Sequence, residues 1–168
     1  KSTSLPIILY SVPSRTGVNI LPETCLELSK ISNIVAIKEA SGNISQVAKI
    51  KALCQDDLAI YSGNDDQVIP LLSLGGIGVI SVLSNIAPKY THDMVIEYLD
   101  GNTKEALNKQ LNALNLINSL FSEVNPIPVK YALKLKGYDF GKPRLPLIEL
   151  SDKNKEVLEK QMKKMNLI

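Results

Sequence analysis

The sequence predicts an α/β fold in which four strand–helix units are followed by a region of helices alone. Short β-branched apolar runs alternate with longer segments of helical period, which is typical of a parallel sheet buried on both faces. After Gly101 only helical periodicity continues. Four units cannot close an eight-stranded barrel, so residues 1–100 form either an open α/β sheet or half of a barrel, and residues 101–168 form a helical region.

The elements of the first hundred residues follow from apolar runs and their flanking residues. Strands are expected over residues 5–10, 34–38, 58–63 and 78–83, and helices over residues 22–32, 44–54, 65–73 and 88–99. Asn43 is placed to cap the second helix, and Pro22 lies in the first turn of the first one. The GGIG run, residues 75–78, is expected to be a tight helix-to-strand turn.

The last third of the chain is expected to be helical. Residues 103–121 carry apolar side chains at helical spacing, NPIPVKYALKL opens a second helix with prolines at its start, and a third spans residues 152–165. No glycine-rich G-x-G-x-x-G follows the first strand, which argues against a nucleotide-binding domain.

Composition limits the classes of partner. The 19 basic and 17 acidic residues leave a net charge of +2 without a basic block large enough to indicate nucleic acid. Neither a signal peptide nor an apolar run of about 20 residues is recognised, so no membrane partner is expected. The two cysteines, Cys25 and Cys54, lack the spacing of a metal site or disulfide framework, which favours a reducing, cytoplasmic location.

Candidate catalytic residues lie where the predicted strands end. In βα folds the carboxyl ends of the strands meet at one rim, where active sites form. Lys38 ends the apolar run IVAIK, Tyr10 ends the first strand, and Arg15 follows in SVPSRTG. An amine that loses hydration beside apolar residues can act as a Schiff-base nucleophile, a phenol can relay protons, and a guanidinium binds carboxylates.

Each of these residues also has a purely structural interpretation. Lysines at strand ends usually extend the ammonium into water along an apolar stem, Tyr10 could be an ordinary strand-end tyrosine, and Arg15 a surface arginine. Asp65 and Asp66 are best explained as the first turn of a helix, where the helix dipole favours acidic residues. The joint occurrence at successive strand ends favours a functional Lys38.

Five motifs in this order and at these intervals resemble the dihydrodipicolinate synthase family over essentially the whole chain: ILYSVPSRTG, IKEASGN, YSGNDD, GGIGVISV and NPIPVK. The resemblance implies the second half of a (β/α)8 TIM barrel followed by a C-terminal helical extension. It further implies a class I aldolase-type lyase that condenses pyruvate with aspartate 4-semialdehyde in the diaminopimelate route to lysine. No cofactor or metal is implied, and the family is usually homo-oligomeric.

The resemblance also assigns roles to individual residues. By motif, Lys38 forms the Schiff base with pyruvate, Tyr10 relays protons, and Arg15 binds the carboxylate of the aldehyde substrate. Gly63 and Ile80 are implied as backbone contacts near the pyruvate. The asparagine that usually follows the tyrosine is serine here, Ser11; we take it as a loop position and assign it no chemistry.

Three alternatives remain open from the sequence. N-acetylneuraminate lyase shares the barrel, the tyrosine and the lysine, but the SRTG arginine and NPIPVK favour the synthase. The chain begins without methionine, and we expect a truncated or cleaved half that lacks the first four βα units and has little or no activity alone; alternatively, a separate chain supplies the complementary N-terminal half as a partner. A non-catalytic half-barrel that associates with itself is the third alternative.

Overall fold

The computed structural model describes residues 3–168, which divide into two compact units that meet between Ile80 and Ser81. The first unit holds the sheet, and the second is made of helices. The expected division near residue 100, which rests on the change of sequence pattern, stays a prediction.

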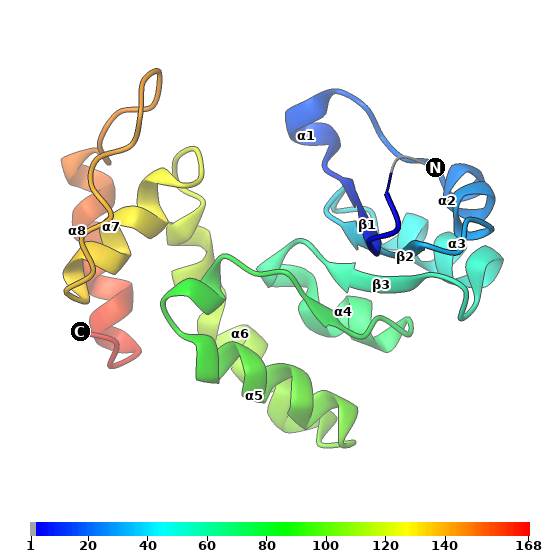
Figure 1. Ribbon diagram of the computed structural model, residues 1–168. Coiled ribbons are helices and arrows are strands. Elements are labelled where there is room, and N and C mark those ends of the chain that lie inside the picture. The colour runs from blue at the N-terminus through cyan, green and yellow to red at the C-terminus, as the bar shows by residue number, and fades with distance from the viewer. Residues whose placement is uncertain (1–2) are drawn as a thin grey trace. The chain divides into compact units, whose positions relative to one another are not determined.

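Four parallel strands form the sheet of the first unit, and they lie side by side in sequence order (Figure 1). These are β1 (Ile7–Ser11), β2 (Ile34–Glu39), β3 (Ala59–Ser62) and β4 (Gly78–Val79). Because the strands are parallel and a helix follows each of the first three, their carboxyl ends share one edge, as the alternating sequence pattern predicts.

One face of this sheet is covered by α2 (Pro22–Ser29), α3 (Ile44–Cys54) and α4 (Val68–Ser73). Apolar side chains from these helices and from the strands form a single buried cluster. Its members are Cys25, Ile34, Ile37, Val47, Ile50, Cys54, Leu58, Ile60 and Leu71. Burial of this cluster provides the main driving force for folding of the unit.

The other face of the sheet, here called the open face, carries the side chains of Ile8, Tyr10, Lys38, Tyr61 and Ile80. Ile8 and Tyr10 are 48% and 47% exposed, which is unusual for side chains in a parallel sheet. The open face is therefore accessible within this unit and exposes apolar side chains beside Lys38 and two tyrosines.

The structure contains each predicted strand and helix, and the bounds of the strands differ by one or two residues except in the fourth strand. The fourth strand is shorter than expected: pairing with β3 stops at Val79, Ile80 adds one backbone bond to Ser62, and Leu83 lies in the 3₁₀ turn η2 (Leu83–Asn85). The Ser81 hydroxyl accepts a hydrogen bond from the Ser84 amide, so the backbone turns at Ser81 and the strand does not continue.

The loop after β1 contains a short helix that the sequence pattern did not indicate, α1 (Pro13–Thr16). Pro13 begins it, and Gly17 ends it with φ of +70°, a conformation that glycine adopts without strain. A four-residue helix is too short to produce hydrophobic periodicity. The expected helix over residues 65–73 begins instead as a 3₁₀ turn, η1 (Asp65–Gln67), and continues as α4.

The predicted cap of α3 is confirmed. The Asn43 side chain accepts a hydrogen bond from the Gln46 amide at 3.1 Å, which satisfies one of the free donors at the start of the helix. The GGIG turn is confirmed as well, since α4 ends at Ser73 and β4 begins at Gly78.

The second unit is built from four helices, and none of the helices within residues 3–168 has the length and apolar character needed to cross a bilayer. They are α5 (Pro88–Leu99), α6 (Thr103–Leu120), α7 (Ile127–Leu135) and α8 (Asp152–Lys164). Buried side chains of α6, α7 and α8 meet in one core, which includes Leu116, Leu120, Ala132, Leu158 and Met162.

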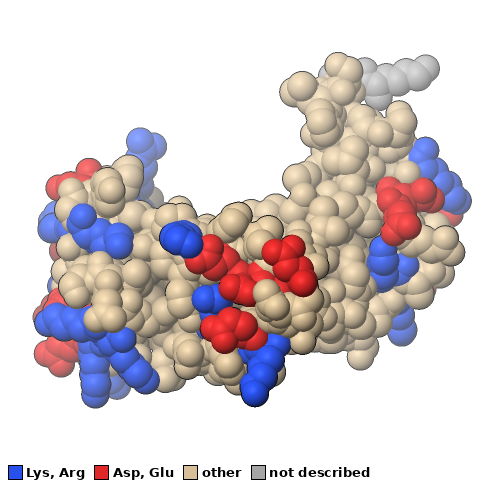
Figure 2. Space-filling model, turned by 90° about the horizontal axis from the view of Figure 1, so that it is seen from below, with Lys and Arg blue, Asp and Glu red and all other residues tan. Residues whose placement is uncertain are grey.

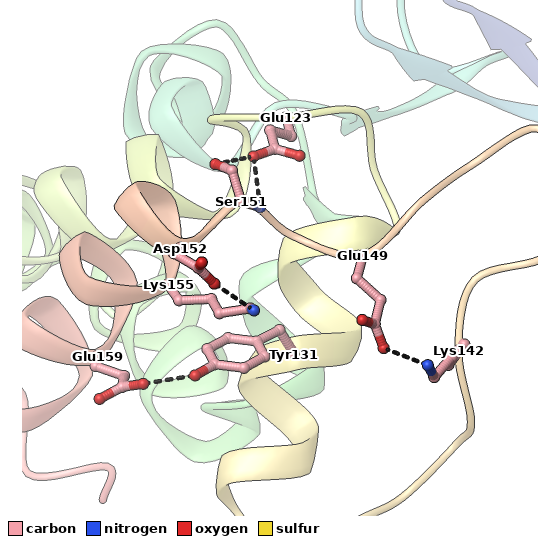
Figure 3. Close-up of polar contacts among 8 residues, drawn as sticks. All are labelled: Glu123, Tyr131, Lys142, Glu149, Ser151, Asp152, Lys155 and Glu159. Atoms are coloured by element: carbon pink, nitrogen blue, oxygen red, sulfur yellow. Dashed lines mark hydrogen bonds and ion pairs between the residues drawn. The ribbon is translucent and has the colours of Figure 1, made fainter.

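Polar contacts fix the start of α8 to the segment before α7 (Figure 3). One carboxylate oxygen of Glu123 accepts hydrogen bonds from the Ser151 amide at 3.1 Å, the Ser151 hydroxyl at 2.6 Å and the Asn154 side chain at 2.8 Å. Those donors, the Ser151 hydroxyl first, lower the pKa of Glu123. The carboxylate also lies at the positive end of the α8 dipole.

Replacing Glu123 by glutamine is expected to destabilise the chain at pH 7 by less than about 1 kcal/mol, because solvent screens a carboxylate at the surface. The folded-state pKa lies below the unfolded value of about 4.3, so the stabilisation is present above that value and is lost as the pH falls through the folded pKa. Urea unfolding of both proteins at pH 7 and at a series of lower pH values that passes through the folded-state pKa measures the difference.

Glu156→Gln, at an exposed position on α8, is the matched control and should change stability little at any of these pH values. A difference between wild type and Glu123→Gln that stays constant as the pH falls would contradict the role given to the charge.

Candidate functional site

Lys38 and Tyr10 lie next to each other at the carboxyl edge of the sheet. They are register partners on β2 and β1, and both side chains project from the open face. The Lys38 ammonium lies over the Tyr10 ring, with Nζ 4.2 Å from the ring centroid, a cation–π contact. The structure thus brings together the two residues that the sequence predicts as nucleophile and proton relay.

Gly63 lies directly against Lys38. A Cβ atom at this position would be 2.6 Å from the Cβ of Ala40, 3.1 Å from the carbonyl oxygen of Glu39 and 3.1 Å from Cε of Lys38. No side chain fits there, and the absence of one leaves room for the lysine stem. The Gly63 amide donates to the Glu39 carbonyl at 2.7 Å, so the hydrogen bonding between the strands continues one residue past β3.

Ile80 and Arg15 occupy the rim of the same unit. Ile80 follows β4 directly, and its amide donates to the Ser62 carbonyl at 2.8 Å, so its backbone lies at the carboxyl edge. Arg15 is exposed in the last turn of α1, and within residues 3–168 its guanidinium forms no ion pair. All five predicted site residues belong to the first unit, but only Lys38, Tyr10 and Gly63 are packed together.

Tyr61 is a neighbour of the candidate nucleophile that sequence reasoning did not single out. It is the register partner of Lys38 on β3, so the lysine lies between two strands that each present a tyrosine. A Cβ on Gly78 would contact the Tyr61 ring at 3.4 Å, an ordinary packing distance. The sequence could have indicated Tyr61, because the motifs IKE and YSG both lie at the ends of predicted neighbouring strands, and aligning these ends places the tyrosine beside Lys38.

The residues that directly follow Tyr10, Lys38 and Tyr61 are polar and buried, and they lie on the opposite face of the sheet. Ser11, Glu39 and Ser62 are register partners, and each is at most 2% exposed. Ser11 is therefore the last residue of β1 and buried, whereas the sequence indicated a loop position. Each of the first three strands thus ends with a residue on the open face followed by a buried polar residue.

The two thiols are poor competitors for the role of nucleophile. Cys25 and Cys54 are free and buried beneath the sheet. Burial raises the pKa of Cys25 to about 11, with smaller contributions from Cys54 and Glu39, and burial also raises the pKa of Cys54. Both remain protonated near neutral pH, and the thiolate is the reactive form. No group of three metal-binding side chains is found within residues 3–168.

A pocket of about 280 Å³ is found in the second unit, where α7, the segment before α8 and α8 line it with several lysines. Figure 2 shows Lys and Arg side chains gathered over the part of the chain that α7 and α8 form. Two of the lysines that line the pocket form ion pairs, Lys155 with Asp152 at 2.8 Å and Lys142 with Glu149 at 3.2 Å (Figure 3). The pocket holds none of the residues that the sequence predicts as nucleophile, proton relay or substrate contact. The candidate site is therefore the one on the first unit.

Known proteins are similar to this chain over nearly its whole length. The profile of the dihydrodipicolinate synthetase family matches residues 1–165. The chain is similar to the 4-hydroxy-tetrahydrodipicolinate synthase of Caldicellulosiruptor saccharolyticus, with 60% identity over 161 residues that cover 96% of this chain and 54% of the relative. The chain thus spans about half the length of the curated relatives it matches.

Solved structures show the same relation. A dihydrodipicolinate synthase from Thermotoga maritima matches with a TM-score of 0.96 and 42% identity, over 99% of this chain and 58% of that one. A chloride-inhibited dihydrodipicolinate synthase from Acinetobacter baumannii, in complex with pyruvate, matches with a TM-score of 0.95 and 38% identity, over 99% and 57%. The fold is thus half of a (β/α)8 barrel with C-terminal helices, as predicted. The chain belongs to the dihydrodipicolinate synthetase family.

Proposed function

We propose that this chain carries the Schiff-base half of a lyase that condenses pyruvate with aspartate 4-semialdehyde, in the diaminopimelate route to lysine. The neutral amine of Lys38 attacks the keto carbon of pyruvate, a C–N bond forms, and loss of water leaves a protonated imine. That cation draws electrons from the pyruvate methyl group, which loses a proton and attacks the aldehyde. Hydrolysis then frees the lysine.

The observation that carries the proposal is the placement of Lys38. Its ammonium lies 4.2 Å from the Tyr10 ring centroid at the carboxyl edge of a parallel sheet, the edge at which βα barrels hold their active sites. Pyruvate in the Acinetobacter baumannii relative supports the keto acid as the first substrate.

The other predicted residues take roles that fit their positions. Tyr10, on the same face as Lys38, would pass protons to and from the carbinolamine oxygen. Arg15, exposed on α1, would bind the carboxylate of the aldehyde substrate as that substrate arrives. Gly63 and the backbone of Ile80 would contact the pyruvate moiety, because Gly63 lies against Lys38 and the Ile80 backbone lies at the same carboxyl edge of the sheet.

Partners and location are part of the same proposal. The open face exposes apolar side chains, including Ile8 and Ile80, and a second copy or a complementary N-terminal half would cover them. Two free, buried thiols are compatible with a reducing compartment, which supports a cytoplasmic location.

Borohydride trapping tests the nucleophile directly. The protein is incubated with pyruvate and then reduced, so that hydride adds to the imine carbon and fixes a secondary amine. We expect peptide mass spectrometry to find the adduct on Lys38 alone. An adduct on another lysine, or none on a folded sample, would contradict the assignment. Incubation with borohydride without pyruvate gives the blank.

A further inference from the structure

A chain of hydrogen bonds lies behind the candidate site, on the helix-covered face of the sheet. Gln46, in the first turn of α3, donates from Nε2 to Oε1 of Glu39 at 3.1 Å and to Oδ1 of Asn19 at 3.1 Å. Asn19 returns a bond from Nδ2 to Oε1 of Gln46 at 2.6 Å. The two amides therefore form a reciprocal pair, and both Nε2 hydrogens of Gln46 are used.

The chain continues to both strand ends. The Ser11 hydroxyl donates to Oδ1 of Asn19 at 3.1 Å and accepts from the Ile20 amide at 3.2 Å. Oε1 of Glu39 also accepts from the Ser41 amide at 3.2 Å, in the loop just after Lys38. Four side chains thus connect the end of β1, the segment after α1, the end of β2 and the start of α3.

Burial makes these contacts consequential. Glu39 is 2% exposed and Gln46 is 6% exposed, and taking a carboxylate out of water is costly unless donors satisfy it. An apolar pair of similar volume would stabilise a packed layer without this cost. Stability alone therefore does not account for a buried carboxylate at this position, directly after the candidate nucleophile.

The segments that the chain connects are those that carry the site. Lys38 precedes Glu39, Tyr10 precedes Ser11, and Arg15 lies in the segment that Asn19 closes. Adjacent residues of a strand point to opposite faces, so holding Ser11 and Glu39 on one face fixes the direction of Tyr10 and Lys38 on the other. The hydrogen bonds therefore connect the three segments that bear Tyr10, Arg15 and Lys38.

We propose that Glu39, Gln46 and Asn19 are positioning residues of the Schiff-base site. They hold the strand end that bears Lys38 against the strand end that bears Tyr10 and against the segment that bears Arg15. The inference rests on the proposed function for the identity of the reaction, and on the hydrogen-bond geometry for the positioning itself.

The test uses two variants and compares the rate of trapping with pyruvate. Gln46→Met keeps the length of the side chain and removes every hydrogen bond of the amide; it should slow trapping at saturating pyruvate about tenfold, since small misplacements of reacting groups are costly. Glu39→Gln keeps an oxygen that can accept from Gln46 and Ser41, so this conservative change should slow trapping less than Gln46→Met does.

Gln55→Met is the matched control, because it makes the same change at an exposed position at the other end of α3. Urea unfolding of each variant gives the folded fraction under assay conditions. Trapping by Gln46→Met at the wild-type rate would overturn the proposal. So would a slowing that matches a loss of folded protein, or one that Gln55→Met shows equally.

A second readout separates this proposal from the proposed function. Trace acetylation followed by mass spectrometry measures the reactivity of Lys38 relative to Lys49, an exposed lysine of α3, without pyruvate. We expect Gln46→Met to change that ratio at least about threefold, in line with a displaced amine. An unchanged ratio would overturn the positioning role. Absence of any adduct in the wild type, with a changed ratio, would count against the Schiff-base function alone.

Discussion

Lys38→Arg is expected to abolish the pyruvate adduct, because a guanidinium remains protonated and cannot form the imine. In a preparation of the chain that catalyses the condensation, the same change should reduce turnover by at least about a thousandfold. Arginine is a suitable replacement because it keeps a cation that can lie over the Tyr10 ring, as Lys38 does at 4.2 Å. Trapping with borohydride and a coupled assay of turnover measure the two effects.

The loss must come from chemistry and not from unfolding. Lys49→Arg, on the exposed side of α3, makes the same change away from the rim and should leave trapping intact. Circular dichroism and urea unfolding of Lys38→Arg should resemble those of the wild type. Retention of a reducible adduct in Lys38→Arg would show that another amine is the nucleophile.

Gly63→Ala is expected to destabilise the chain by about 1–3 kcal/mol and to impair trapping, since an added methyl group would overpack the carboxyl edge. The new Cβ would lie 2.6 Å from the Ala40 Cβ and 3.1 Å from both the Glu39 carbonyl oxygen and Cε of Lys38. The strand ends must shift or the lysine stem must move. Urea unfolding measures the first effect, and the trapping rate measures the second.

Gly78→Ala is the matched control for this change. Gly78 also lies at the rim, but its added Cβ would approach only the Tyr61 ring, at 3.4 Å, which is ordinary van der Waals contact. The control should therefore cost little stability and preserve trapping. Equal stability and equal trapping rates of Gly63→Ala and Gly78→Ala would show that the close approach of Gly63 to Lys38 does not affect the reaction.

Much of the fold could be predicted because each element is short and has regular periodicity. The helices over residues 44–54 and 88–99 were predicted with the bounds that the structure has, since a capping Asn43 and a leading Pro88 define their starts. The short helix α1 and the early end of β4 could not be predicted. Both depend on single turns, at Gly17 and at Ser81, that leave no periodic pattern.

The sequence was sufficient to predict which residues form the candidate site, but not the hydrogen bonds that lie behind them. The motifs named Lys38 and Tyr10, and strand alternation explains their common face. The bonds among Asn19, Gln46 and Glu39 join positions up to 27 residues apart, and short polar residues give no sequence signal of pairing over such a distance. Only the register of the folded strands brings them together.

The order of the strands has a consequence for how the site assembles during folding. Each strand pairs with the strand nearest to it in the sequence, so Tyr10 meets Lys38, and Lys38 meets Tyr61, after closure of loops of fewer than about thirty residues. The entropy lost on closing such loops is modest, and contacts between near neighbours in sequence form quickly. The edge that carries the candidate site can therefore form one βα unit at a time, with Lys38 in the middle strand of the first three.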